Sequence, residues 1–154
     1  MALRNIVKVG DDVLRKKCFP VTSFDEKLHL LLDDMKETLA KAQGAGLAGP
    51  QVGVLRRIFI VDTEESGYVE MINPEILSVS GSQYVTEGCL SVPGKWGEVD
   101  RPKYVTVKYQ DRYGKEHKVK AKDFFAQAIC HENDHLNGVL YIDKADNLRS
   151  ENKK

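Results

Sequence analysis

The feature that most constrains this chain is a pair of histidines near its C-terminus. His131 and His135 stand four residues apart, and Glu132 follows the first of them. In a helix, side chains at this spacing leave the same face, so the two imidazoles can bind one metal ion. The carboxylate is then placed to take a proton from a water on that ion. Because the pattern also fits two polar residues on a half-buried helix, a third ligand from elsewhere in the chain has to decide.

The residues around the histidines predict that they lie on a helix. Apolar residues recur at helical spacing at Phe124, Phe125, Ala128, Ile129 and Leu136. Asp123 is placed to cap the start of this helix, and Gly138 is placed to end it.

Outside this helix the chain predicts a mixture of helix and short strands. Ser23 and Glu26 form a capping box that predicts the start of a helix. This helix is predicted to run to about residue 42, with an apolar stripe of Leu28, Leu31, Leu32, Met35 and Leu39. Alternation and turn residues predict strands at 57–62, 68–72, 76–79 and 83–87, and a hairpin of 104–110 with 116–121. We expect a single domain of residues 1–147, followed by a polar tail, 148–154, that frays.

Cys89 is the candidate for the third metal ligand. It follows a predicted strand and stands between Gly88 and Leu90, in a stretch that Pro93 marks as an irregular loop. A free cysteine is most often a small buried hydrophobic residue. However, one thiolate with two imidazoles leaves the open coordination position that catalytic metal sites have. The three cysteines of the chain are widely spaced, which suits neither a disulfide framework nor a zinc knuckle.

A glycine-rich segment, residues 44–53, contains the Gly-x-Gly-x-x-Gly pattern of dinucleotide-binding proteins. That pattern must follow a strand and open a helix. Here a helix precedes it, Pro50 interrupts it and a strand follows, so we reject the nucleotide-binding interpretation. The glycines fit either a simple connection between helix and strand or a backbone that approaches a ligand closely.

Composition narrows the class of partner. The 154 residues include 23 basic and 23 acidic side chains, so no net charge attracts nucleic acid or an anionic membrane. The N-terminus lacks the apolar run of a secretory signal, and no segment reaches the length of a membrane span. We expect a cytoplasmic protein with no membrane or direct nucleic-acid partner.

Three blocks of the sequence together resemble the peptide deformylases, which remove the formyl group from nascent bacterial polypeptides. The blocks are residues 44–53, 87–94 and 131–138, and their order and approximate spacing are those of that family. The resemblance covers nearly the whole chain. It implies an α+β fold, with mixed, mostly antiparallel sheets around a central helix that bears the histidines. It also implies that the N-terminal helix packs outside the sheets and that the substrates are N-formyl-methionyl peptides.

The resemblance implies a metal site made by Cys89, His131 and His135. This ligand set fits zinc and also accepts Fe(II), Ni(II) or Co(II). Because the family is regarded as ferrous in cells, we expect one Fe²⁺ per chain, with Zn²⁺, Ni²⁺ or Co²⁺ as possible substitutes.

Catalytic roles also follow from the resemblance. Glu132 would act as general base and then return the proton to the departing amine. The side-chain amide of Gln51 and the backbone N–H of Leu90 would stabilise the oxyanion.

Substrate contacts follow in the same way. An extended peptide would pair with the backbone near Gly46, and its methionine side chain would enter a pocket bounded by Ala45, Phe124 and Ala128. The ribosome is a candidate partner, although the chain after residue 143 is too short for a long basic helix, and we expect a monomer.

Further residues match positions that support the site in the family. Glu87 and Arg101 correspond to residues that pair and steady the cysteine loop, and Asp134 is a candidate partner for a ligand imidazole. Some positions depart from the family. Ala45 replaces a usual Val or Ile, Cys130 replaces a frequent Gln, Asn133 is unusually polar, and Gly94 and Trp96 stand where many relatives have an acidic residue and an arginine.

Two other functions remain open. A zinc endopeptidase shares His-Glu-x-x-His but takes its third ligand from a downstream His or Glu. After the motif this chain offers only Asp143, Asp146, Glu151 and the terminus. A non-catalytic binding protein on the same scaffold would usually lack the general base, whereas Glu132 is present.

Overall fold

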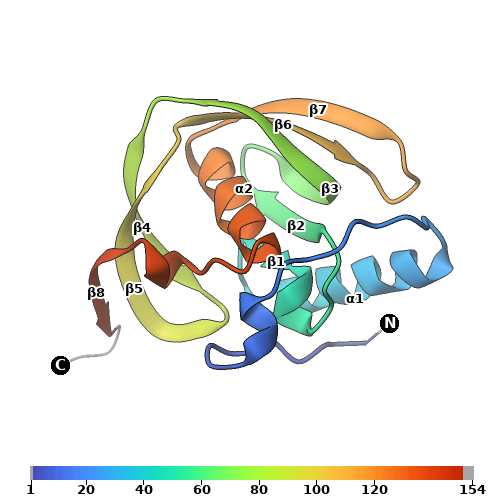
Figure 1. Ribbon diagram of the computed structural model, residues 1–154, viewed down its shortest axis with the longest axis horizontal. Coiled ribbons are helices and arrows are strands. Elements are labelled where there is room, and N and C mark those ends of the chain that lie inside the picture. The colour runs from blue at the N-terminus through green and yellow to red at the C-terminus, as the bar shows by residue number, and fades with distance from the viewer. Residues whose placement is uncertain (1, 151–154) are drawn as a thin grey trace.

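A buried helix, α2 (Asp123–Leu136), is the central element of the computed structural model, which describes residues 2–150 (Figure 1). All six residues from Phe125 to Cys130 are buried. Such a helix must be covered on most of its sides, and here β-strands curve around it. The predicted α+β fold with a central, histidine-bearing helix is confirmed.

The strands form two antiparallel sheets. The first has the order β1-β2-β3-β6-β7. Its strands are β1 (Gly46–Ala48), β2 (Ile58–Thr63), β3 (Gly67–Ser80), β6 (Tyr104–Gln110) and β7 (Glu116–Lys122). The second has the order β4-β5-β8. It contains β4 (Gln83–Cys89), β5 (Val92–Arg101) and β8 (Asp146–Ser150).

Strand β2 separates two hydrophobic cores. Its residues 58–61 are all fully buried, and successive side chains of a strand point to opposite faces. Phe59 and Val61 pack with α2, whereas Ile58 and Ile60 pack with the second long helix, α1 (Glu26–Ala42). The apolar stripe of α1 therefore covers the outer face of the first sheet, as predicted.

The starts of both helices differ from the prediction. The side chain that caps α1 belongs to Asp25, which accepts a hydrogen bond from the Leu28 backbone, and not to Ser23. Asp123 is the first residue of α2 and not its cap, because its carboxylate binds Lys103 at 2.9 Å. A side chain engaged by Lys103, in the turn between β5 and β6, is not available to its own helix.

Strand β3 is continuous where the sequence predicted two short strands. Asn73 adopts a left-handed conformation, with φ of 52°, and the register to β6 shifts between Ile72 and Glu75. Its side chain exchanges hydrogen bonds with the Val21 backbone and donates to Gln110. The Asn-Pro pair therefore forms a bulge within the strand and does not end it.

Two strands of the second sheet were not predicted. Strand β5 contains two glycines and a proline and has no regular alternation of apolar residues. Strand β8 is exposed along its length and pairs with β5, so the expected fraying is wrong for residues 148–150. Residues 151–154 lie outside the described part of the chain. Within residues 2–150, three short 3₁₀ turns also contribute: η1 (Asp12–Arg15), η2 (Gly49–Val52), in the glycine-rich segment, and η3 (Tyr141–Asp143).

Gly138 tests how closely the turn after α2 packs against the backbone of Arg15. It has φ of +77°, and a Cβ there would lie 2.5 Å from the backbone oxygen of Arg15. Gly53 has φ of +81° with nothing within 4 Å of such a Cβ, so it isolates the conformational cost. We expect Gly53→Ala to lower the free energy of unfolding by about 1–2 kcal/mol. Gly138→Ala should cost roughly 1–3 kcal/mol more, because backbone must move. Urea unfolding measures both, and equal losses would contradict this account.

Candidate metal centre and active site

Three side chains from two distant segments form a metal-binding group. Cys89 ends β4, and His131 and His135 leave the same face of α2. The potential ligand atoms of the three residues all lie within 4.8 Å of one another, and Cys89 Sγ is 3.4 Å from His135 Nε2. Ligands of a tetrahedral zinc-type site, with bonds of about 2.0–2.3 Å, stand roughly 3.5 Å apart. The donor set and its spacing therefore fit a divalent transition metal.

A buried network orients the first histidine. Nδ1 of His131 forms a 2.8 Å hydrogen bond with Glu87, which leaves Nε2 for the metal. Arg101 donates two hydrogen bonds to the same carboxylate, at 2.7 and 2.8 Å, and a third to Asp134 at 2.8 Å. Glu87 and Arg101 are thus paired as the resemblance implied. Asp134 does not act as expected: it binds Arg101 and Lys144, and Glu87 contacts the imidazole.

The pKa values of these groups follow from burial and from charge pairing. Burial alone would raise the pKa of Glu87, but hydrogen bonds from Arg101 and His131 outweigh it and lower the pKa to about 2. Burial, as the larger cause, and the charge of His131 together lower the pKa of His135 to about 3. His135 is therefore a neutral imidazole, the form that binds metals.

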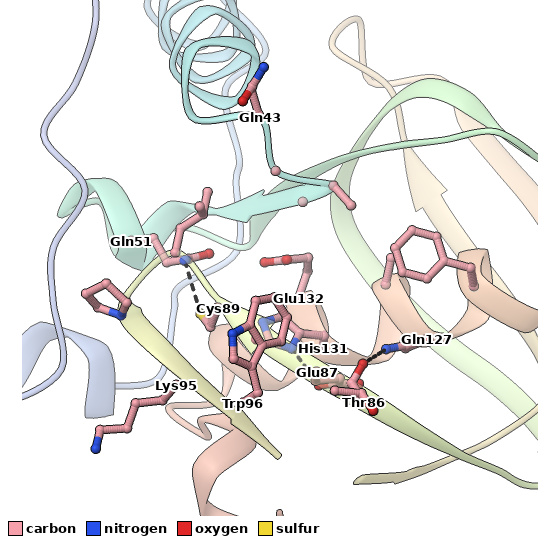
Figure 2. Close-up of a pocket in the computed structure, with 18 of the residues that line it drawn as sticks. Gln43, Gln51, Thr86, Glu87, Cys89, Lys95, Trp96, Gln127, His131 and Glu132 are labelled. Carbon is pink, nitrogen blue, oxygen red and sulfur yellow. Dashed lines mark hydrogen bonds and ion pairs between the residues drawn. The ribbon is translucent and has the colours of Figure 1, made fainter. Parts of the chain in front are cut away.

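Glu132 places a carboxylate beside the metal-binding group (Figure 2). Its side chain is buried, and its Oε1 has no hydrogen-bond partner among residues 2–150. Burial raises the pKa of Glu132 to about 7. A Cβ added at Gly46 would lie 2.9 Å from its Cδ, so only glycine leaves room for this carboxylate. A buried carboxylate oxygen facing a cleft is suited to accept a proton from water.

Gln51 aims an amide N–H at the same site. Its Oε1 accepts a hydrogen bond from the Ala48 backbone at 3.0 Å, which fixes the orientation of the amide. Its Nε2 then lies 3.6 Å from Cys89 Sγ and donates to Ser91 Oγ at 3.1 Å. Ser91 is fully buried and was assigned no role from sequence, although it lies in the block 87–94 that resembles the family.

Cys89, His131, Glu132 and Gln51 line a cavity of about 450 Å³. Its walls include the predicted substrate residues Ala45, Gly46, Phe124 and Ala128, and also Leu90. His135 is almost fully buried. The lining residues with no role assigned from sequence include Gln127, whose amide reaches the Thr86 carbonyl at 3.4 Å, and Trp96 (Figure 2).

Comparison with known proteins identifies the family. The family model described as polypeptide deformylase matches residues 3–151. The chain belongs to the polypeptide deformylase family. It is 53% identical over 151 residues to the peptide deformylase of Caldicellulosiruptor bescii, and the aligned region covers 98% of this chain and 90% of that protein. Peptide deformylase 1 of Clostridium acetobutylicum is 54% identical over 144 residues, covering 94% of this chain and 95% of the relative.

Solved deformylase structures share the fold. The enzyme from Thermotoga maritima superposes with a TM-score of 0.91 at 43% identity, covering 94% of this chain and 98% of that one. The enzyme from Ehrlichia chaffeensis, solved in complex with actinonin, has a TM-score of 0.91 at 37% identity, covering 96% and 91%. The chain is thus a metal-dependent hydrolase that removes the N-formyl group from newly synthesised polypeptides. No helix within residues 2–150 is long and apolar enough to cross a membrane.

The buried ion pair leads to a prediction about stability. Arg101→Met leaves the Glu87 carboxylate charged and without its main partner, so it should lower the free energy of unfolding by about 3–5 kcal/mol. Arg101→Met combined with Glu87→Gln removes both charges and should recover at least ~1 kcal/mol of that loss. Urea unfolding in the presence of a chelator measures both without a contribution from bound metal. A double variant less stable than the single one would disprove the interpretation.

The contact between Gly46 and Glu132 leads to a prediction about activity. Gly46→Ala should displace the carboxylate and reduce kcat/KM about 100-fold, because small misplacements of a reacting group are costly. Metal content should stay at one per chain. As a control, the Cβ of Gly44→Ala would meet only the ends of the Leu90 and Leu39 side chains, which can turn aside. A Gly46→Ala enzyme as active as Gly44→Ala would show that the carboxylate tolerates displacement.

Proposed function

We propose that Glu132 acts as the general base of deformylation in a site whose metal is held by Cys89, His131 and His135. The observation that supports this most is the free oxygen of a buried carboxylate beside a thiol and two imidazoles within 4.8 Å of one another. A divalent ion bound there would acidify a water and polarise the formyl oxygen. The ligand set accepts Fe²⁺, Zn²⁺, Ni²⁺ and Co²⁺. We propose Fe²⁺ as the native ion, because the family is regarded as ferrous in cells, and the other three ions as substitutes.

The protein groups would each handle one part of the hydrolysis. Glu132 takes a proton from the attacking water and later delivers it to the peptide nitrogen as the C–N bond breaks. Formate and a free N-terminal amine are the products. The amide of Gln51, already aimed at the site, and the backbone N–H of Leu90 donate to the oxyanion that forms between these steps.

The sheet edge supports a main-chain mode of substrate binding. Strand β1 lies at the edge of the first sheet and pairs with β2 on one side. Its other edge is available to an extended peptide, which would hydrogen-bond to the backbone at Gly46. The methionine side chain would then lie among Ala45, Phe124 and Ala128, which line the same cavity. We further propose a single catalytic domain, extended beyond the expected residue 147 to include all of β8, that acts as a monomer on nascent chains in the cytoplasm, with the ribosome as a candidate partner.

An endopeptidase is the less suitable alternative. Such an enzyme would take its third ligand from the chain after His135. Asp143 instead binds Arg15 at 2.6 Å, and Asp146 accepts a hydrogen bond from Tyr84 at 3.0 Å. Glu151 lies outside the described residues. The described downstream carboxylates are thus engaged elsewhere, whereas Cys89 lies beside the histidines.

Formate release tests the proposed roles. Purified without oxygen and loaded with Fe²⁺, the wild-type enzyme should release formate from formyl-Met-Ala-Ser. Glu132→Gln should retain stoichiometric metal but lose about 100- to 10,000-fold in kcat, because it removes a general base. Cys89→Ser should lose metal affinity. If Glu132→Gln is as active as wild type at equal metal content, another group is the base, and if Cys89→Ser binds metal normally, the ligand set is wrong.

A further inference from the structure

Tyr141 is a buried aromatic residue to which the proposed chemistry gives no role. It begins a 3₁₀ turn, η3 (Tyr141–Asp143), six residues after His135. Only 1% of its surface is exposed, and it is among the largest fully buried side chains of the protein. No sequence motif marked it, because an aromatic residue after a helix is usually part of the core.

The ring of Tyr141 lies near two of the three proposed metal ligands. Together with Val92 and Val99 it forms a small core under the second sheet, and Cys89 packs against that core. Its ring centroid is 6.0 Å from that of His131, with the planes inclined by 31°. The side chain of Tyr141 is thus close both to the Cys89 thiol on β4 and to the His131 imidazole on α2.

The hydroxyl of Tyr141 connects to the strand that follows the cysteine. It donates a 2.9 Å hydrogen bond to the backbone oxygen of Lys95, on β5. Near this point the pairing of β4 with β5 shifts register, between Glu87 and Cys89. The regular ladder of backbone hydrogen bonds between the two strands is therefore interrupted next to the cysteine. Burial raises the pKa of Tyr141 to about 12, so the hydroxyl remains a donor. Burying a hydroxyl is costly without a partner, and here it has one.

We propose that Tyr141 is a positioning residue of the metal centre, whose hydroxyl fixes β5 at Lys95 while its ring supports Cys89 and His131. The two ligands come from elements that share no backbone pairing, so a common support keeps the thiol at a constant distance from the imidazoles. This inference rests on the metal site proposed above. A phenylalanine would fill nearly the same volume, so the contribution of the hydroxyl can be separated from that of the ring.

The test compares Tyr141→Phe with Tyr84→Phe in protein loaded with Co²⁺. Tyr84 is a matched control, because its hydroxyl also makes one hydrogen bond, to Asp146 at 3.0 Å, but its side chain is exposed. Two measurements report on the site without activity: the thiolate-to-cobalt absorption band and the rate at which a chelator removes the cobalt. We expect Tyr141→Phe to release cobalt about tenfold faster or more and to change the band, as loss of a group supporting metal ligands does. Tyr84→Phe should match wild type.

The outcomes separate this inference from the proposed site. If Tyr141→Phe melts at a lower temperature but keeps the wild-type band and release rate, Tyr141 is an ordinary core residue and the inference is wrong. The same conclusion follows if Tyr84→Phe accelerates release equally. If wild-type protein shows no thiolate-to-cobalt band, the proposed ligand set fails and the inference fails with it.

Discussion

The buried pairing of Arg101 with Glu87 is the interaction on which the site most depends. Both side chains are almost fully buried, and transferring such charges from water is costly unless every partner is in place. Here the partners are complete: Glu87 on β4 binds His131, and Arg101 on β5 binds Asp134, three residues further along α2. This network therefore attaches the second sheet to the central helix at His131 and at Asp134. A ligand imidazole is one member of the same network, so the correct docking of the sheet also sets the orientation of the ligand.

The site also depends on how little space the surrounding elements leave. Helix α2 carries both histidines and Glu132, and the carboxylate lies against the backbone of β1, where Gly46 has no side chain. Strand β1 is in turn held by β2, whose buried residues face both cores. The position of the proposed base thus follows from the packing of the first sheet, whereas the thiol is contributed by the second.

The sequence predicted the centre of this structure better than its periphery. The histidine spacing, Cys89 next to a glycine and the apolar stripe of α1 are local patterns, and the structure brings the three ligands together. Strand β5 was not predicted because its glycines, proline and exposed residues lack alternation, although its partners β4 and β8 stabilise it. Asn73, Ser91 and Tyr141 have roles that arise from contacts with segments distant in sequence. Those contacts leave no signal in the residues themselves, which is also why the imidazole partner was assigned to Asp134 and not to Glu87.

Trp96 gives the cavity a fluorescent side chain in its wall. It is the only tryptophan of the chain, it lines the catalytic cavity, and a Cβ on Gly88 would lie 2.6 Å from its ring, so the indole rests on the backbone next to Cys89. All indole emission of the protein therefore originates at the wall of its cleft. Tryptophan fluorescence can therefore follow occupancy of the cleft in unlabelled protein.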